Sequence, residues 1–190
     1  MAAEKRGMSD TCPFCRTPLP ENDADSVAMV QARVAKKDPN ALHNLGLAYC
    51  HGNLGVQKDM RKAVETTEEA AELGSIEALY NLGISYTKGE GVEVDRAKGI
   101  EFFRRGAMQG CAECRHSLGL HEKVGNYDRA VRHWMISANM GHQESVEIIK
   151  QFFMKGAATK EQYTEALRGY QVAVEEMKSH DRDEAKRIGH

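Results

Sequence analysis

The sequence predicts an all-α fold, a right-handed α-solenoid of antiparallel helical hairpins with helical caps. The first observation behind this prediction is that a leucine, a glycine and a tyrosine recur after 37 positions, and four further residues recur after 36. The matching residues are Leu45, Gly46 and Tyr49 with Leu82, Gly83 and Tyr86, and Val56, Asp59, Ala71 and Gly74 with Val92, Asp95, Ala107 and Gly110. Self-similarity at such a period is typical of stacked hairpins, because one hairpin cannot bury its own apolar face.

The second observation is a third, weaker copy of the same unit. A leucine–glycine pair recurs after 36 positions, and the end of the unit recurs once a loop five residues shorter is allowed. The matching residues are Leu118 and Gly119 with Leu82 and Gly83, and Ala138 and Gly141 with Ala107 and Gly110. We therefore predict three repeats, at residues 39–74, 75–110 and 111–141.

Helix start and stop signals support the repeat boundaries. Asp38 and Ser75 are predicted N-caps, and Pro39 fits the first helical position, where its missing N–H costs nothing. The glycines of residues 89–91 are expected to end the first helix, because glycine adopts positive φ at little cost. Asp95 is expected to cap the second helix, which turns its apolar residues inward. These are Ile100, Phe103 and Ala107.

Helices are also predicted on both sides of the repeats. Residues 25–38 should form an N-terminal capping helix from Ser26 to Ala35, and residues 142–179 a degenerate C-terminal repeat and cap. In that repeat the first helix is expected to end at residue 154, and the second to begin at a capping box that starts with Thr159. The residues expected to face inward are Val146, Ile149, Phe153, Tyr163, Leu167, Tyr170, Val174 and Met177. Residues 1–24 are predicted to be disordered and residues 180–190 to be a charged tail.

The segment ALYNLGISYTKGEGVEVD at residues 78–95 resembles the Sel-one-like repeat, a relative of the tetratricopeptide repeat. The third copy departs from that family, because residues 123–130 replace the Gly-x-Gly-Val loop and are closer to a plain tetratricopeptide turn. The resemblance implies that the first helix of each repeat lines a concave groove that binds a partner. The groove residues would be His43, Asn44, Tyr80, Asn81, His116 and Ser117. Asn44 and Asn81 could equally be repeat consensus that serves packing.

Composition excludes several classes of function. The net charge of −2 gives no basic footprint for nucleic acid, and no apolar run approaches the ~20 residues that span a membrane. No apolar stretch follows Lys5 and Arg6, so we expect no secretory signal. Five cysteines, an odd number, favour free thiols or metal ligands over a disulfide framework. We therefore expect a cytoplasmic or nuclear protein.

Near the N-terminus, the segment from Cys12 to Cys15 resembles the closing zinc knuckle of a RING finger. Two thiolates three residues apart can share one tetrahedral zinc, but they supply only half of its ligands. Three interpretations stay open: a remnant or truncation of a longer RING protein, a zinc site completed by another chain, or a plain loop. We expect no cofactor unless other residues complete this zinc site.

Other candidates for chemistry have structural explanations. The second C-x-x-C aligns with the first repeat helix, because Cys111 matches the cap Ser75 and Cys114 matches the core residue Ala78. A buried small residue and a cap-position thiol are therefore favoured over metal or redox chemistry, which stays the alternative. The eight histidines are scattered and do not pair, and Trp134 aligns with the core residue Phe103.

These patterns predict a protein that is not an enzyme. We expect a scaffold or adaptor that binds a protein or peptide along the concave groove, as a monomer or weak homo-oligomer. The alternative function is the substrate-binding part of a RING-type ubiquitin-ligase-related protein whose RING is truncated here.

Overall fold

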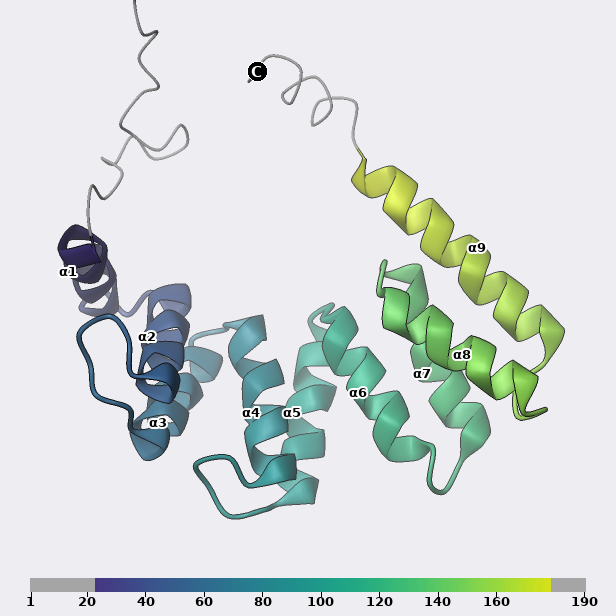
Figure 1. Cartoon of the computed structure of the whole chain (residues 1–190), viewed down its shortest axis with the longest axis horizontal. Coiled ribbons are helices and arrows are strands. Elements are labelled where there is room, and N and C mark those ends of the chain that lie inside the picture. The colour runs from purple at the N-terminus through teal and green to yellow at the C-terminus, as the bar shows by residue number, and fades with distance from the viewer. Residues whose placement is uncertain (1–22, 179–190) are drawn as a thin grey trace, which may run out of the picture. The chain divides into compact units, whose positions relative to one another are not determined.

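The computed structural model describes residues 23–178, and in that range every regular element is an α-helix (Figure 1). The all-α prediction is confirmed, and the helices form the hairpins of a solenoid. Residues up to Leu73 and residues from Gly74 onward form two compact units. The predicted disordered N-terminus, its two cysteines and the charged tail lie outside the described residues, except for Asp23 and Ala24.

The first unit contains a short helix followed by one hairpin. Its helices are α1 (Asp23–Val34), α2 (Pro39–His51) and α3 (Met60–Glu72). The predicted N-cap Asp38 accepts from the backbone N–H groups of Asn40 and Ala41 at 2.9 and 3.0 Å. Arg33 donates to the same carboxylate at 2.8 Å, which ties α1 to the start of α2 and lowers the Asp38 pKa. Helix α1 begins three residues before the predicted start at Ser26.

The second unit contains three consecutive hairpins. Its helices are α4 (Ile76–Lys88), α5 (Arg96–Met108), α6 (Ala112–Glu122), α7 (Tyr127–Asn139), α8 (Gln143–Met154) and α9 (Lys160–Met177). Ser75 and Asp95 cap α4 and α5 as predicted, and Gly89 ends α4 with φ +78°. The capping box of α9 is also present, since Thr159 and Gln162 hydrogen-bond reciprocally at 2.8 and 3.2 Å.

A glycine fixes how closely the two helices of each repeat approach. A Cβ placed on Gly83 of α4 would lie 2.4 Å from the Phe103 ring of α5. The equivalent glycines of the other two repeats are similar. A Cβ placed on Gly46 would lie 2.4 Å from the Thr67 hydroxyl oxygen, and one placed on Gly119 would lie 2.3 Å from the Trp134 indole nitrogen. A real Cβ does not approach another heavy atom so closely, so each partner side chain occupies the space that the missing side chain leaves.

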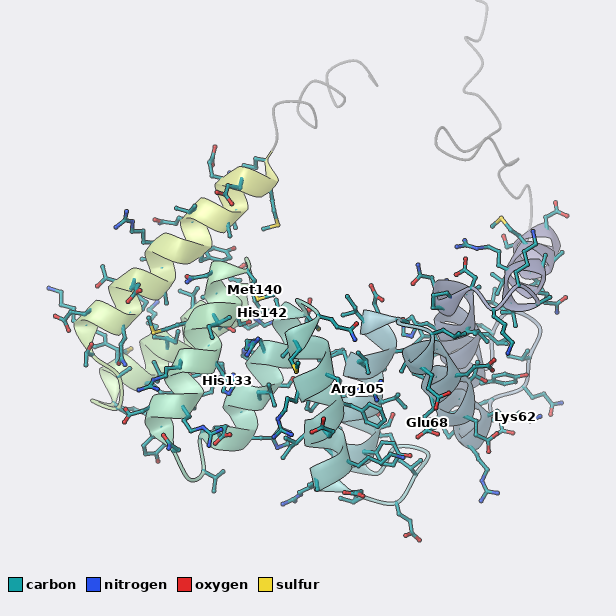
Figure 2. The ribbon with its side chains drawn as sticks, turned by 180° about the vertical axis from the view of Figure 1, so that it is seen from behind. Lys62, Glu68, Arg105, His133, Met140 and His142 are labelled. Atoms are coloured by element: carbon teal, nitrogen blue, oxygen red, sulfur yellow. The ribbon has the colours of Figure 1, made fainter. Side chains whose placement is uncertain are left out.

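The contact between the end of the first helix and the start of the second differs in its chemistry from repeat to repeat. In the first repeat, the Lys62 ammonium lies 5.8 Å from the Tyr49 ring centre. In the second, Lys98 lies 4.0 Å from the Tyr86 ring, which stacks on Phe102. The third repeat has an ion pair at the equivalent positions, with Arg129 3.0 Å from Glu122, and His133 in place of the phenylalanine. Figure 2 labels Lys62 and His133. The repeat with the shorter loop therefore has an ion pair where the other two repeats have a lysine–tyrosine contact.

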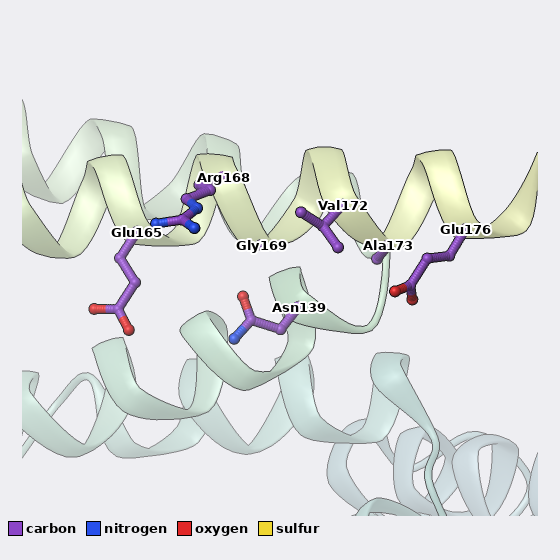
Figure 3. A pocket seen from close by; sticks show the side chains of 7 residues that line it. All are labelled: Asn139, Glu165, Arg168, Gly169, Val172, Ala173 and Glu176. Atoms are coloured by element: carbon purple, nitrogen blue, oxygen red, sulfur yellow. The ribbon is translucent and has the colours of Figure 1, made fainter.

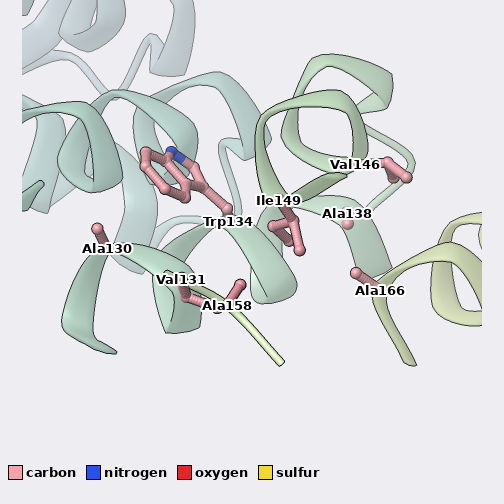
Figure 4. Packing of buried hydrophobic residues seen from close by; sticks show 8 residues of the cluster. All are labelled: Ala130, Val131, Trp134, Ala138, Val146, Ile149, Ala158 and Ala166. Atoms are coloured by element: carbon pink, nitrogen blue, oxygen red, sulfur yellow. The ribbon is translucent and has the colours of Figure 1, made fainter. Parts of the chain in front are cut away.

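A buried cluster in the last two hairpins closes the second unit (Figure 4). Its members come from α7, α8, α9 and the loop before α9: Ala130, Val131, Trp134, Ala138, Val146, Ile149, Ala158 and Ala166. Trp134 is fully buried, as predicted from its alignment with Phe103, and its indole N–H donates to the His116 carbonyl at 3.2 Å.

Two predictions about the C-terminal helices need correction, and one buried residue was missed. Phe153 was expected to face inward, but it is 37% exposed and stacks on Tyr163, whereas Phe152 packs against the buried cluster. Residue 152 lies three positions after the buried Ile149 and residue 153 four, and helical periodicity allows either. Met177 is 48% exposed, and the fully buried residue of α9 is Ala166, which the sequence pattern missed.

Replacing Gly83 with alanine should destabilise the protein. The added methyl would meet the Phe103 ring, which is 2% exposed and cannot move aside freely. Overpacking of this kind costs about 1–3 kcal/mol, against a helix-propensity gain of about 1 kcal/mol. The midpoint of urea unfolding should therefore fall. Gly125→Ala is the control, because a Cβ there has no heavy atom within 4 Å. An unchanged or higher midpoint for Gly83→Ala would show that the contact is not limiting.

Candidate functional site

The candidate surface is formed by the first helices of the three hairpins in the second unit, α4, α6 and α8, which we call the first-helix row. Tyr80 of α4 lies near the start of α6, where the Glu113 carboxylate helps to raise its pKa after the larger effect of burial. His116 of α6 reaches Ser145 of α8, with Nδ1 2.8 Å from Oγ. These contacts place the three helices next to one another in chain order.

The predicted groove residues fall into two groups. His43 and Asn44 lie on α2 of the first unit, where His43 is half-buried and Asn44 exposed. Tyr80, Asn81, His116 and Ser117 lie on the first-helix row. Asn81 is half-buried, and Tyr80 packs its ring 6.0 Å from Phe103. Ser117 is 8% exposed, so the prediction that it faces a partner does not fit its burial.

His116 joins two repeats instead of lining an open groove. Its ring centre lies 4.7 Å from that of His142, the N-cap residue of α8. Nδ1 of His142 lies 3.2 Å from the same Ser145 hydroxyl, which is fully buried. Burial, followed by the nearby His142, lowers the pKa of His116 to about 4. The histidines were predicted not to pair as catalytic or metal-binding groups, and that pattern gave no sign of this packing contact between His116 and His142.

An alignment of the helix caps contains the sequence signal for the contact between His116 and His142. His142 aligns with Cys111 and Ser75, the N-caps of α6 and α4, while His116 aligns with Tyr80. Tyr80 lies near Cys111, the cap of the helix that follows it, and His116 lies beside His142 in the same way. This position therefore lies near the next cap in two successive repeats.

Sequence reasoning also missed a row of carboxylates on this surface. Glu77, Glu113 and Glu144 each lie two residues after an N-cap, at the start of α4, α6 and α8, and all three are exposed. Each contacts its own cap: Ser75 Oγ lies 3.3 Å from Glu77, Cys111 Sγ 3.4 Å from Glu113, and His142 Nε2 3.5 Å from Glu144. Negative charge at a helix N-terminus is favourable, which explains each carboxylate individually. Together these three, the acidic row, give one end of the first-helix row a negative edge.

The second C-x-x-C occupies the places that its alignment predicts. Cys111 is the N-cap of α6, and its sulfur accepts from the Cys114 backbone N–H at 3.2 Å. Cys114 is fully buried, and its sulfur fills the space over Gly106, where a Cβ would lie 2.4 Å away. The prediction of a buried small residue and a cap-position thiol is confirmed.

A hollow of about 360 Å³ lies between the end of α7 and α9. Its lining residues are Asn139, Glu165, Arg168, Gly169, Val172, Ala173 and Glu176 (Figure 3). The Asn139 amide lies against α9 at Gly169. A Cβ placed on Gly169 would be 1.7 Å from the Asn139 side-chain oxygen. None of the predicted groove residues contributes to this hollow. A glycine among the apolar residues of the last helix is the sequence signal that could have indicated it.

Metal and membrane features can be assessed for residues 23–178. In that range, no three histidine, cysteine or acidic side chains are grouped as metal ligands would be. The predicted zinc half-site at Cys12 and Cys15 lies outside it. Within the same range, no helix has both the length and the apolar character that crossing a membrane requires.

Comparisons with a family model and with solved structures find similarity to Sel1 repeats. The family model described as Sel1 repeat matches residues 39–75 and 76–111. A crystal structure of a Sel1 repeat protein from Oxalobacter formigenes superposes with a TM-score of 0.70 at 25% identity, covering 82% of this chain and 65% of that one. A protective antigen of uropathogenic Escherichia coli strains, displaying an SLR fold, gives 0.67 at 26% identity, covering 79% of this chain and 33% of that one.

A curated relative is much longer than the matched region. The rat protein DAP3-binding cell death enhancer 1 is 30% identical over 105 residues, which cover 53% of this chain. The chain spans only 20% of the length of that relative. The match therefore concerns the repeat region and not the whole rat protein.

The buried His116 should make stability depend on pH. Its folded pKa of about 4 lies below the ordinary value of 6.5, so the unfolded chain binds a proton first as the pH falls. Stability should therefore decrease between pH 6.5 and pH 4. His116→Asn keeps a hydrogen-bonding group near Ser145 but does not titrate. Urea midpoints measured from pH 7.5 downward should fall less steeply for this variant, provided that it is folded at pH 7.5. Equal slopes in both proteins would contradict a buried neutral His116.

Proposed function

Because residues 39–75 and 76–111 are two Sel1 repeats, we propose that this protein is a non-catalytic scaffold that binds a segment of another protein along its first-helix row. Proteins of this repeat type are typically protein-interaction scaffolds and are generally not catalytic. The proposal goes further in naming the surface and the chemistry of the partner.

The acidic row is the observation that carries the proposal. Glu77, Glu113 and Glu144 occupy the same position on the first helices of three successive hairpins and are exposed to solvent. Inter-repeat contacts hold these helices in fixed order, so the carboxylates have a defined spacing, with neighbouring helices typically about 8–10 Å apart. An extended segment with lysine or arginine at matching intervals would pair with them. The partner we propose is therefore a basic protein segment.

The proposed binding surface, the acidic row of the first-helix row, differs from the groove that the sequence predicted. Tyr80 packs against the cluster that contains Cys111 and Cys114 of the next repeat, and His116 contacts His142 of the repeat after its own, which leaves little of either side chain for a partner. Asn81 is half-buried and stays a proposed contact residue, because its amide can both donate to and accept from a peptide backbone. Asn44 offers a similar exposed amide in the first unit, as a separate proposal.

Two further features of the proposal concern its cellular setting. The name of the rat relative describes binding to DAP3, which supports a protein ligand for this chain only by similarity over the repeats. We place the protein in the cytoplasm or nucleus, in keeping with its odd number of cysteines. The alternative role in a ubiquitin ligase rests on Cys12 and Cys15, outside the described residues, and stays a prediction.

Selection from a displayed library of random peptides tests this function. The full chain should enrich peptides that carry several lysines or arginines. A triple variant, Glu77→Gln, Glu113→Gln and Glu144→Gln, removes the charges and keeps the side-chain size. Exposed ion pairs contribute about 0.2–1 kcal/mol each, so the variant should bind the selected peptides roughly 3- to 100-fold more weakly.

A matched control removes the same number of charges from α9. Its substitutions are Glu165→Gln, Glu175→Gln and Glu176→Gln, all at exposed positions. This control should bind the peptides nearly as well as the wild type. Equal weakening in both variants would indicate non-specific attraction to net charge, and a failure to enrich any peptide would oppose the scaffold proposal itself.

A further inference from the structure

The first turn of α6 holds two thiols that the scaffold function does not use. Cys111 and Cys114 are three residues apart, and both are free cysteines in the second unit. We propose that they form a redox-active dithiol that a small peroxide converts into an intramolecular disulfide. This inference is independent of the peptide-binding proposal.

The cap position of Cys111 brings its side chain toward Cys114. Cys111 is the N-cap of α6 and Cys114 is the third residue of the same first turn, and a disulfide requires Cβ atoms about 3.5–4.5 Å apart. The Cys111 sulfur already turns toward the following turn, where it accepts from the Cys114 backbone N–H at 3.2 Å. Small side-chain rotations would therefore bring the sulfurs together.

The two sulfurs have unequal surroundings, which assigns them different roles. Cys111 is 7% exposed and Cys114 is fully buried. The hydrogen bond from the Cys114 thiol lowers the pKa of Cys111, while the same bond and burial raise the pKa of Cys114. The thiolate is the nucleophile in such chemistry. Cys111 is therefore the attacking group, and Cys114 is the resolving group.

The packing around the pair selects the oxidant by size. Ile76 and Tyr80 pack against the cluster that contains both cysteines, and the Glu113 carboxylate lies 3.4 Å from the Cys111 sulfur. Because Cys111 as a residue is only 7% exposed, its thiol is more accessible to hydrogen peroxide than to a bulky disulfide. A negatively charged neighbour also disfavours anionic oxidants. Hydrogen peroxide, which is small and neutral, meets both conditions.

The reaction balances with peroxide as the sole oxidant. The Cys111 thiolate attacks one peroxide oxygen, the O–O bond breaks, and the departing hydroxide takes up the proton that Cys111 released, giving a sulfenic acid and water. The Cys114 sulfur then attacks the Cys111 sulfur, and the sulfenic hydroxyl leaves with the Cys114 proton as a second water. Two thiols are oxidised by two electrons, and one peroxide is reduced.

The repeat itself shows that the local structure does not require sulfur. Ser75 caps α4 in the place that Cys111 has on α6, and Ala78 fills the buried place of Cys114. Cys111→Ser and Cys114→Ala therefore convert the third repeat to the residues of the second. Both variants should keep the helical circular dichroism of the wild type.

Peptide mapping of the full chain tests the proposal. Trypsin cleaves after Arg105 and Arg115, so both cysteines, and no others, lie in one peptide of residues 106–115. After peroxide treatment and alkylation under denaturing conditions, this peptide should lack alkyl groups and be two hydrogens lighter than its dithiol form. Dithiothreitol should restore double alkylation. Cys114→Ala should stop at the sulfenic acid, which dimedone captures at Cys111, and Cys111→Ser should form no disulfide.

The same peptide carries an internal control. Met108 is 80% exposed, and its conversion to the sulfoxide reports that peroxide reached this segment. If Met108 is oxidised while both cysteines are still fully alkylated, the pair is only a helix cap and a core residue, and the proposal is overturned. A disulfide from either cysteine to another peptide would overturn it as well.

Discussion

The close approach of the two helices in each repeat is the constraint on which the rest of the structure depends. A glycine on the first helix meets a larger side chain from the second, and that partner changes from Thr67 to Phe103 to Trp134 along the chain. The glycine keeps the backbone separation small while the partner grows. The larger partner adds buried apolar area, and it also reaches the next hairpin, as the Trp134 indole does through its edge contact with Phe152.

Stacking within the second unit depends on the helix caps. Ser75, Cys111 and His142 hold the same position in three repeats. Within the second unit, Tyr80 lies near Cys111 and His116 lies against His142. A side chain that packs on the next cap cannot also be free for a ligand. Tyr80 and His116 therefore serve the solenoid, while the exposed carboxylates two residues after each cap are left at the surface. The same short segment thus provides both stacking and charge.

The repeat period predicted most of the fold because it aligns residues whose surroundings recur. It placed Trp134 and Cys114 in the core and Asp38, Ser75 and Asp95 at helix starts, all from local chemistry. It did not separate Phe152 from Phe153, since either fits a helical stripe. The pairing of His116 with His142 and the burial of Ser117 depend on how adjacent hairpins pack, which a pattern along one helix does not contain. The acidic row was missed because glutamate in a first helical turn has an ordinary explanation.

The shared hydroxyl of Ser145 couples two imidazole rings from different repeats. A serine hydroxyl has a single hydrogen, so it can donate to the Nδ1 atom of His116 or of His142 but not to both. At least one of the two rings must therefore carry its own hydrogen on Nδ1. A ring that accepts the serine hydrogen at Nδ1 in one repeat therefore requires the Nδ1-protonated form of the ring in the other repeat.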